Sequence, residues 1–110
     1  MEIYISQNAD IKIIKTDDFK NFKLVVKGAP GDQTRQVIER ALCDFGTFAD
    51  EAYAWIDAQQ LVVRSGKGHD ASWLQGFNEM TALGRRYGFV QDNPMRIRAH
   101  IEWIVCDKQD

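Results

Sequence analysis

Three segments within the first 27 residues alternate between apolar and polar side chains, which is the pattern of half-buried β-strands. They cover residues 2–6, 11–15 and 22–27. The polar stretch between the first two suits the turn of a hairpin, and a second polar break precedes the third. Because these connections are short, the sequence predicts an antiparallel arrangement of the three strands.

The next segment changes to the helical spacing of three and four residues. Asp32 suits the N-cap of a first helix, and Gly46 takes the position of a left-handed C-terminal cap. The apolar stripe of this helix consists of Val37, Ile38, Ala41, Leu42 and Phe45. We expect this stripe to be buried, with Cys43 near the buried side.

A short buried strand is predicted for residues 52–56, followed by a short helix over residues 58–65. Asp57 suits the N-cap of this helix, and Gly66 suits its end. The alternative is that residues 61–63 form a strand, because β-branched side chains favour an extended chain.

A long helix follows, and its pattern is the clearest in the chain. Asp70 suits its N-cap, and the helix is expected to end near Gly88. Its apolar positions are Trp73, Leu74, Phe77, Met80, Leu83 and Tyr87. Glycine inside a helix costs about 1 kcal/mol relative to alanine. We therefore expect close packing at Gly76 and Gly84.

The last alternating segment, residues 96–105, predicts a strand with one apolar and one polar side. The apolar side carries Ile97, Ala99, Ile101 and Trp103, and the polar side carries Arg98, His100 and Glu102. The order of the elements predicts an α+β fold. We expect a two-layer sandwich, in which a mainly antiparallel sheet of about five strands carries two main helices on one face.

Composition favours a single domain over residues 1–110, because 45% of the chain is hydrophobic and 27% is charged. A chain of this length has room for one core, so any pocket is expected to be small or shared with a second subunit. No apolar stretch approaches the roughly 20 residues of a membrane-spanning helix. The first residues lack the features of a secretory signal, and we expect Cys43 and Cys106 to be free thiols in a cytoplasmic protein.

The charge and the motifs exclude several classes of function. A net charge of −2 gives no general attraction to phosphate polymers, so nucleic-acid binding is not expected. The sequence contains no phosphate-binding loop, dinucleotide-binding motif or nucleophile elbow, and we expect no cofactor. The two histidines, His69 and His100, lack the paired spacing of metal ligands, so no metal site is expected.

The polar side of the last strand is the first candidate site. Arg98, His100 and Glu102 share one face, which suits binding of an anion, or proton exchange by His100 with Glu102 fixing its tautomer. Lysines are expected on the same face if the apolar sides of the strands align: Lys12, Lys23 and Lys27. The alternative is a solvated surface with cross-strand ion pairs.

The second candidate site is a cluster of aromatic side chains: Tyr53, Trp55, Trp73, Phe77, Tyr87, Phe89 and Trp103. Trp55, Trp73 and Trp103 would line a ligand pocket beside the long helix, where Gly76 and Gly84 leave room. The alternative is that these tryptophans belong to the core, as aromatic stripes at strand or helix spacing usually do.

These observations favour a small cytosolic accessory domain that binds a ligand or another protein and forms a homodimer. The expected ligand is a small anionic molecule. The alternative is a small cofactor-independent enzyme. In that case His100 or His69 is the general acid or base, and Glu102, Asp57 or Asp70 orients it.

Overall fold

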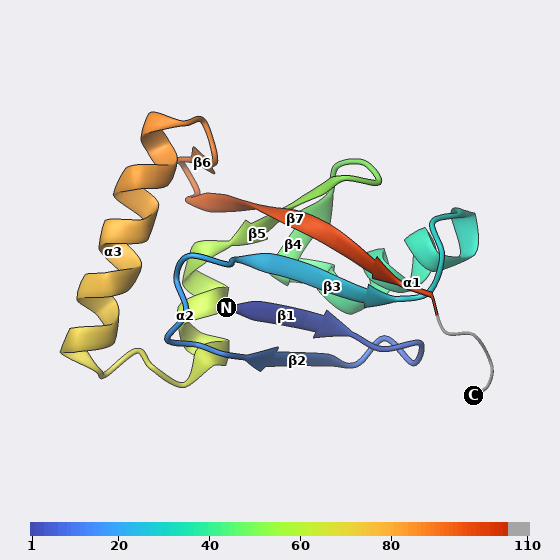
Figure 1. Ribbon diagram of the computed structural model, residues 1–110, viewed down its shortest axis with the longest axis horizontal. Coiled ribbons are helices and arrows are strands. Elements are labelled where there is room, and N and C mark those ends of the chain that lie inside the picture. The colour runs from blue at the N-terminus through green and yellow to red at the C-terminus, as the bar shows by residue number, and fades with distance from the viewer. Residues whose placement is uncertain (106–110) are drawn as a thin grey trace.

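Seven strands form one curled, mixed sheet in the computed structural model, which describes residues 1–105 (Figure 1). The strands are β1 Glu2–Ile5, β2 Ile11–Ile14, β3 Lys23–Lys27, β4 Gly46–Phe48, β5 Tyr53–Asp57, β6 Val90–Gln91 and β7 Arg96–Ile104. The α-helices are α1 Asp32–Leu42, α2 Ala58–Ser65 and α3 Ala71–Arg86, and a single 3₁₀ turn, η1 Cys43–Phe45, follows α1. The α+β class is therefore confirmed.

The sheet differs from the predicted one in its strand directions. Its order is β2-β1-β3-β7-β5-β4, with β6 paired to β7. The predicted hairpin of β1 and β2 is antiparallel, but β1 pairs with β3, and β3 with β7, in parallel. The connection after β2 carries the chain past β1, so β3 pairs with the other side of β1 and runs in the same direction. A two-layer sandwich with a mainly antiparallel sheet of about five strands is therefore not confirmed.

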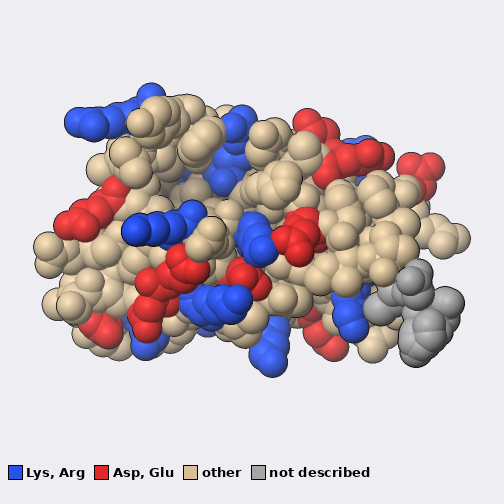
Figure 2. Space-filling model, in the orientation of Figure 1, with Lys and Arg blue, Asp and Glu red and all other residues tan. Residues whose placement is uncertain are grey.

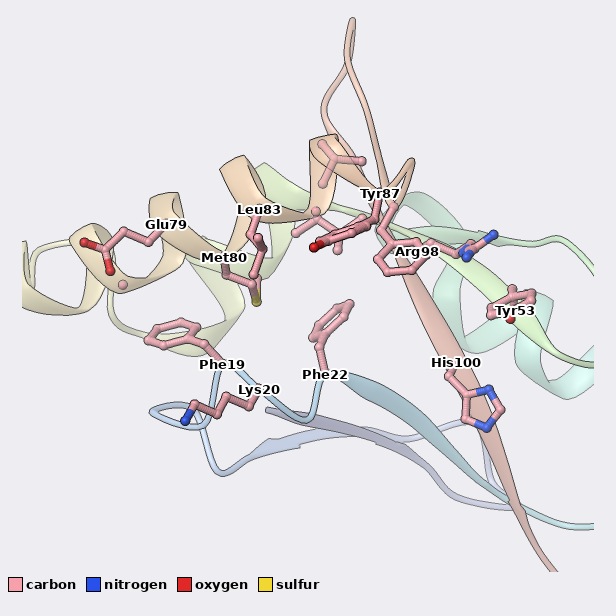
Figure 3. A pocket seen from close by; sticks show the side chains of 15 residues that line it. Phe19, Lys20, Phe22, Tyr53, Glu79, Met80, Leu83, Tyr87, Arg98 and His100 are labelled. Carbon is pink, nitrogen blue, oxygen red and sulfur yellow. The ribbon is translucent and has the colours of Figure 1, made fainter.

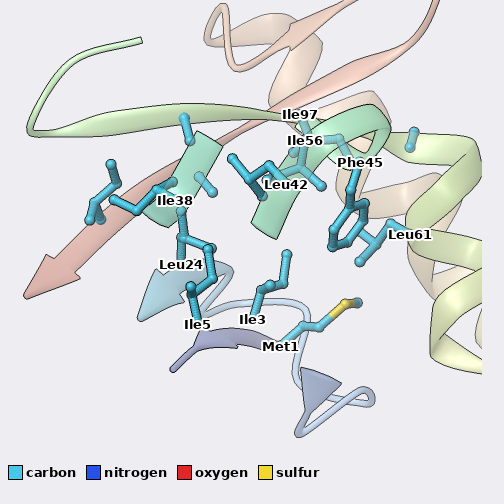
Figure 4. Packing of buried hydrophobic residues seen from close by; sticks show 14 of the residues in the cluster. Met1, Ile3, Ile5, Leu24, Ile38, Leu42, Phe45, Ile56, Leu61 and Ile97 are labelled. Carbon is cyan, nitrogen blue, oxygen red and sulfur yellow. The ribbon is translucent and has the colours of Figure 1, made fainter. Parts of the chain in front are cut away.

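One face of the sheet carries the core together with α1 and α2 (Figure 4). The buried residues of β7 alternate, as the sequence predicts, and Leu24 of β3 is the register partner of Ile101 on this face. In β3 the burial does not alternate, because Val25 is buried as well as Leu24 and Val26. The helical side chains that meet the core face include Ile38, Leu42, Phe45 and Leu61. Each large apolar side chain buried in this way stabilises the fold by about 1.5–3 kcal/mol.

Helix α2 has the bounds that the sequence predicts, so the alternative of a strand over residues 61–63 is wrong. The Asp57 carboxylate accepts a hydrogen bond from the Gln60 backbone N–H at 2.8 Å, and Gly66 ends the helix with φ 74°. Asp70 likewise caps α3 by accepting from the Trp73 N–H at 3.0 Å. These caps satisfy backbone donors that the first turn of a helix leaves unpaired.

The predicted ends of α1 are wrong in detail. Gly31 is the N-cap and Asp32 is the first helical residue. Gly46 is extended with φ −175° and begins β4, whereas the left-handed residue is Cys43 with φ 48°. The Cys43 side chain is exposed rather than near the buried side. Cys106 lies outside the described residues.

Helix α3 stands at one end of the sheet, beside β6 and the start of β7 (Figure 1). It is buried at Trp73, Phe77 and Thr81, whereas Leu83 and Tyr87 are exposed. The helices within residues 1–105 are all too short or too polar to cross a membrane. The second half of α3 overhangs the sheet face that faces away from α1 and α2. The prediction that the two main helices lie on one face of the sheet is therefore not confirmed.

The two glycines of α3 mark its closest contacts, as the sequence predicts. A Cβ atom at Gly76 would lie 2.6 Å from Cε2 of Phe19, and one at Gly84 would lie 2.9 Å from Cγ2 of Val90. These distances are too short for a carbon–carbon contact. Glycine is therefore needed where α3 meets the β2–β3 connection and β6.

Replacing Gly76 with alanine should destabilise the fold, although alanine is the better helix former. Alanine gains about 1 kcal/mol in helix propensity, but overpacking against Phe19, whose ring lies on Trp73 with centroids 5.5 Å apart, costs about 1–3 kcal/mol. We expect a net loss of about 1 kcal/mol in the free energy of unfolding, measured by urea denaturation. Ser72→Ala, at an exposed position of α3, is the matched control and should not destabilise. An equally stable or more stable Gly76→Ala protein would contradict this packing.

Candidate functional site

A cavity of about 720 Å³ opens between α3, the β2–β3 connection and the sheet face that faces away from α1 and α2 (Figure 3). Its volume lies in the range of small-molecule sites. Most of its lining is apolar: Phe19, Phe22, Met80, Leu83, Tyr87, Phe89 and Val90. Its charged or titratable side chains include Lys20, Glu79, Arg98 and His100. A wide apolar site with a few polar groups is thus the main candidate in residues 1–105.

Each wall of the cavity follows from local structure. The α3 wall is built from Gly76, Met80 and Leu83, which share one flank because they are spaced by three and four residues. The sheet wall is built from Arg98 and His100, which alternate with the buried residues of β7. The prediction that the polar side of β7 faces away from the core is therefore confirmed.

Arg98 lies between two aromatic rings. Its guanidinium carbon is 4.1 Å from the centroid of Tyr53 and 4.5 Å from that of Phe89. The backbone N–H of Arg98 donates to the carbonyl of Phe89 at 2.8 Å, which holds the two residues together. Such cation–π contacts cover the faces of the guanidinium plane but leave the N–H groups at its edge free.

The side chain of Arg98 has no hydrogen-bond acceptor and no ion-pair partner within residues 1–105. By contrast, Arg85 is held by Asp92 and Lys23 by Glu102. A half-buried cation normally finds a counter-charge, because burying an unpaired charge is costly. Arg98 therefore presents unsatisfied donors to the cavity.

His100 lines the same cavity, beside Tyr53, with ring centroids 6.1 Å apart and planes at 69°. No hydrogen bond joins His100 to Glu102 in the described part of the chain. The Oε1 atom of Glu102 instead accepts a hydrogen bond from Lys23 Nζ at 2.6 Å. This bond raises the pKa of Lys23 above its ordinary value of 10.5. The alternative of cross-strand ion pairs therefore describes Glu102, whereas Arg98 and His100 stay candidates for an anion site.

The predicted lysines lie elsewhere on this face or at its edge. Lys23 is the register partner of His100, Lys12 pairs with Tyr4 on the outer strand, and Lys27 pairs with Ile104. None of the three lines the cavity. In the view of Figure 2, basic and acidic side chains are interspersed over the surface.

The three tryptophans do not line the cavity. Trp73 is buried, donates from Nε1 to the Thr16 carbonyl at 2.7 Å, and thereby supports the cavity wall from the core side. Trp55 is the register partner of Arg98. Trp103 packs against the core and donates to the Glu51 carbonyl at 2.9 Å. The core interpretation therefore fits Trp73 and Trp103 better than the pocket interpretation.

The other predicted acid–base residues are apart from the cavity. His69 is exposed in the turn between α2 and α3. Asp70 and Asp57 accept backbone hydrogen bonds as helix caps. Of the predicted acid–base residues, His100 alone lines the cavity.

Several cavity residues escaped the sequence interpretation. Phe19 and Phe22 lie in or next to a polar break between strands, whereas Phe89, which follows the end of α3, belongs to the predicted aromatic cluster. The only signal of Phe19 and Phe22 is that two large apolar side chains occur where loops are usually polar. The carboxylate of Glu79 belongs to the α3 wall and gave no local signal.

Arg85 and Asp92 fix the end of α3 to the β6–β7 turn. Asp92 accepts from Arg85 Nη2 at 2.9 Å and from Nε at 3.2 Å, and these bonds lower the pKa of Asp92 below its ordinary value of 3.8. Because the pKa is lower in the folded state, the pair stabilises the fold above about pH 3.8. That contribution is lost as the pH falls through the folded-state pKa.

The carboxyl signal of Asp92 in an NMR titration should therefore have its midpoint below 3.8. Arg85→Gln should return the midpoint towards that value, because the two charge-assisted hydrogen bonds are lost. The neighbouring substitution Arg86→Gln should leave it nearly unchanged. A wild-type midpoint at or above the ordinary value would contradict the ion pair.

No group of three or more metal-ligating side chains occurs in residues 1–105. No protein-family model matches the chain, and comparisons with curated proteins and with solved structures gave no significant match. Function must therefore be inferred from the cavity itself, which is mostly apolar and is lined by Arg98, an arginine without a counter-charge among residues 1–105.

Proposed function

We propose that this protein is a small cytosolic ligand-binding domain whose cavity holds an organic anion with an apolar body. The observation that carries the proposal is the guanidinium of Arg98, stacked between Tyr53 and Phe89 with no acceptor within residues 1–105. A carboxylate is the natural partner for the N–H edge of a guanidinium, because its two oxygens match two parallel N–H donors.

The charges of the cavity orient the ligand. Figure 3 shows Arg98, His100 and Tyr53 at one end and Glu79 with Lys20 at the other. Glu79 repels an anion, whereas no carboxylate of the described residues lines the Arg98 end of the cavity, so the Arg98 end is favoured for the carboxylate. The apolar body then contacts Phe22 and Met80 between the two ends, and each Å² of apolar surface removed from water contributes about 25 cal/mol.

A thermal-shift screen with matched pairs of compounds tests this proposal. Each pair consists of an aliphatic or aromatic carboxylic acid and the primary amide of the same body. We expect some acids to raise the melting temperature clearly and their amides to raise it little, because a ligand that binds the folded state stabilises it. The proposal is wrong if acids and amides of every body give equal shifts, or none.

An enzyme remains the second proposal, because His100 lines the same cavity as Arg98. In this case the imidazole transfers a proton to or from the bound anion, without an orienting carboxylate from Glu102, which bonds to Lys23. Incubating the acids identified by the screen with the protein and analysing them by mass spectrometry distinguishes the two proposals. A converted compound, with conversion abolished in His100→Asn, favours the enzyme.

We also propose that the protein is a homodimer, and that its interface does not involve pairing of β1 or β7 with a second copy. Both β1 and β7 lie inside the sheet, each between two neighbours, so they have no free edge. The edge strands β2 and β4 have four and three residues. Pairing through such short edges would bury little surface, so another part of the molecule must supply most of the interface.

A further inference from the structure

The second half of α3 and the residues just after it present an apolar patch that forms one rim of the cavity. Leu83 is 53% exposed, Tyr87 is 67% exposed, and Phe89, which follows the helix, is 41% exposed. Within residues 1–105 the other exposed large hydrophobic residues are Val63 and Val105. Three of these five side chains thus gather on one patch, and patches of this kind mark interaction sites.

Two opposite charges flank Leu83 on the same helix. Glu79 and Arg86 are seven residues apart, which is about two turns, so they lie on one side of α3. Neither forms an ion pair within residues 1–105. Glu79 accepts one long hydrogen bond, at 3.4 Å from Gln75, whereas the adjacent Arg85 is held by Asp92. The side of α3 that carries Leu83 therefore has one free charge of each sign.

We infer that a second copy of this chain docks on α3, with the two α3 helices antiparallel about a two-fold axis near residues 82 and 83. This inference rests on the homodimer in the proposed function. The axis places Glu79 opposite Arg86 of the partner subunit, and the symmetry repeats this pair on the other side. Leu83 meets its own copy at the axis, and the small side chain of Ala82 lets the helices approach.

Charge complementarity is the reason for choosing a second copy as the occupant. A parallel arrangement would place Glu79 against Glu79 and Arg86 against Arg86, so the antiparallel arrangement is favoured. In the antiparallel arrangement the partner helix also covers exposed surface of Leu83 and Tyr87, two residues that line the cavity. The interface therefore lies next to the mouth of each ligand site.

Light scattering after size-exclusion chromatography, without ligand, tests the interface first. The wild-type chain should have the mass of a dimer at micromolar concentration, and Leu83→Glu should have the mass of a monomer. The matched control is Val63→Glu, which places the same charge on α2 at a residue that is 69% exposed, and it should stay dimeric. Circular dichroism verifies that each variant is folded.

A charge exchange tests the orientation of the helices. Glu79→Arg and Arg86→Glu should each raise the dimer dissociation constant by about tenfold, and the double variant should return it close to the wild-type value. A wild-type monomer at all concentrations overturns both the homodimer and this interface. A dimer that withstands Leu83→Glu, or a double variant that is no better than the single ones, overturns the interface alone. Acid binding to the cavity is measured separately and is not decided by either result.

Discussion

Replacing Arg98 with methionine should weaken the binding of an organic carboxylate by about 30-fold, because charge-assisted hydrogen bonds contribute about 1.5–3 kcal/mol. Methionine keeps an apolar stem between Tyr53 and Phe89 but has no donor. Binding of the matching amide should change by less than about threefold. The carboxylate affinity of Arg98→Lys should lie between those of the wild type and Arg98→Met, because lysine keeps the charge but not the planar row of N–H donors. Isothermal titration calorimetry measures all of these affinities.

Arg64 offers a matched control for this substitution. Its guanidinium carbon also lies over an aromatic ring, 4.7 Å from the centroid of Phe45, but it belongs to α2 and does not line the cavity. Arg64→Met should therefore leave the carboxylate affinity unchanged. Equal losses for Arg64→Met and Arg98→Met would mean that general charge, and not the cavity, attracts the anion.

Replacing Leu61 with alanine should lower the free energy of unfolding by about 2–5 kcal/mol, which is a large part of the stability of a chain of this size. Leu61 is fully buried, and it packs in the core beneath the sheet with Phe45 and Ile56 (Figure 4). The loss has two causes, because apolar atoms are no longer buried and a cavity is left behind. Urea denaturation at constant pH measures the effect.

Val63 supplies the control from the same helix. It is 69% exposed, so Val63→Ala should change the free energy of unfolding by less than about 0.5 kcal/mol. If the two alanine variants were equally stable, Leu61 would not lie in the core and α2 would pack differently.

Local signals in the sequence were sufficient for the bounds of α2 and for the two faces of β7. Asp57 and Gly66 delimit α2 because a cap depends on a few neighbouring residues, and the β-branched pair in that helix did not override them. The alternation in β7 separated Ile97 and Ile101 from His100 correctly, since period two needs no knowledge of partners.

Strand pairing could not be predicted in the same way. The parallel pairs of β3 join residues that are far apart in the chain, and no short motif specifies them. Gly46 shows a related limit, because a glycine after a helix favours a left-handed cap, yet here the pairing of Gly46 with Ile56 in β4 and β5 keeps it extended.

The sequence indicates only the part of the candidate site that lies on a single strand. Arg98 and His100 could be identified because they share a strand face. The cavity itself depends on where α3 stands relative to the sheet, and this placement brings Phe19, Met80 and Phe89 together from three segments. For Trp73 the sequence leaves the pocket and the core as alternatives, and the packing places it in the core, against Phe19.

The most direct measurement of the central claim is an NMR titration that observes the side-chain Nε–H of Arg98 while a carboxylic acid from the screen is added. We predict a saturable shift of this signal, with contacts from the ligand's apolar protons to Met80 and Phe22. An Arg98 signal that stays in place while the ligand perturbs other parts of the surface would contradict the account.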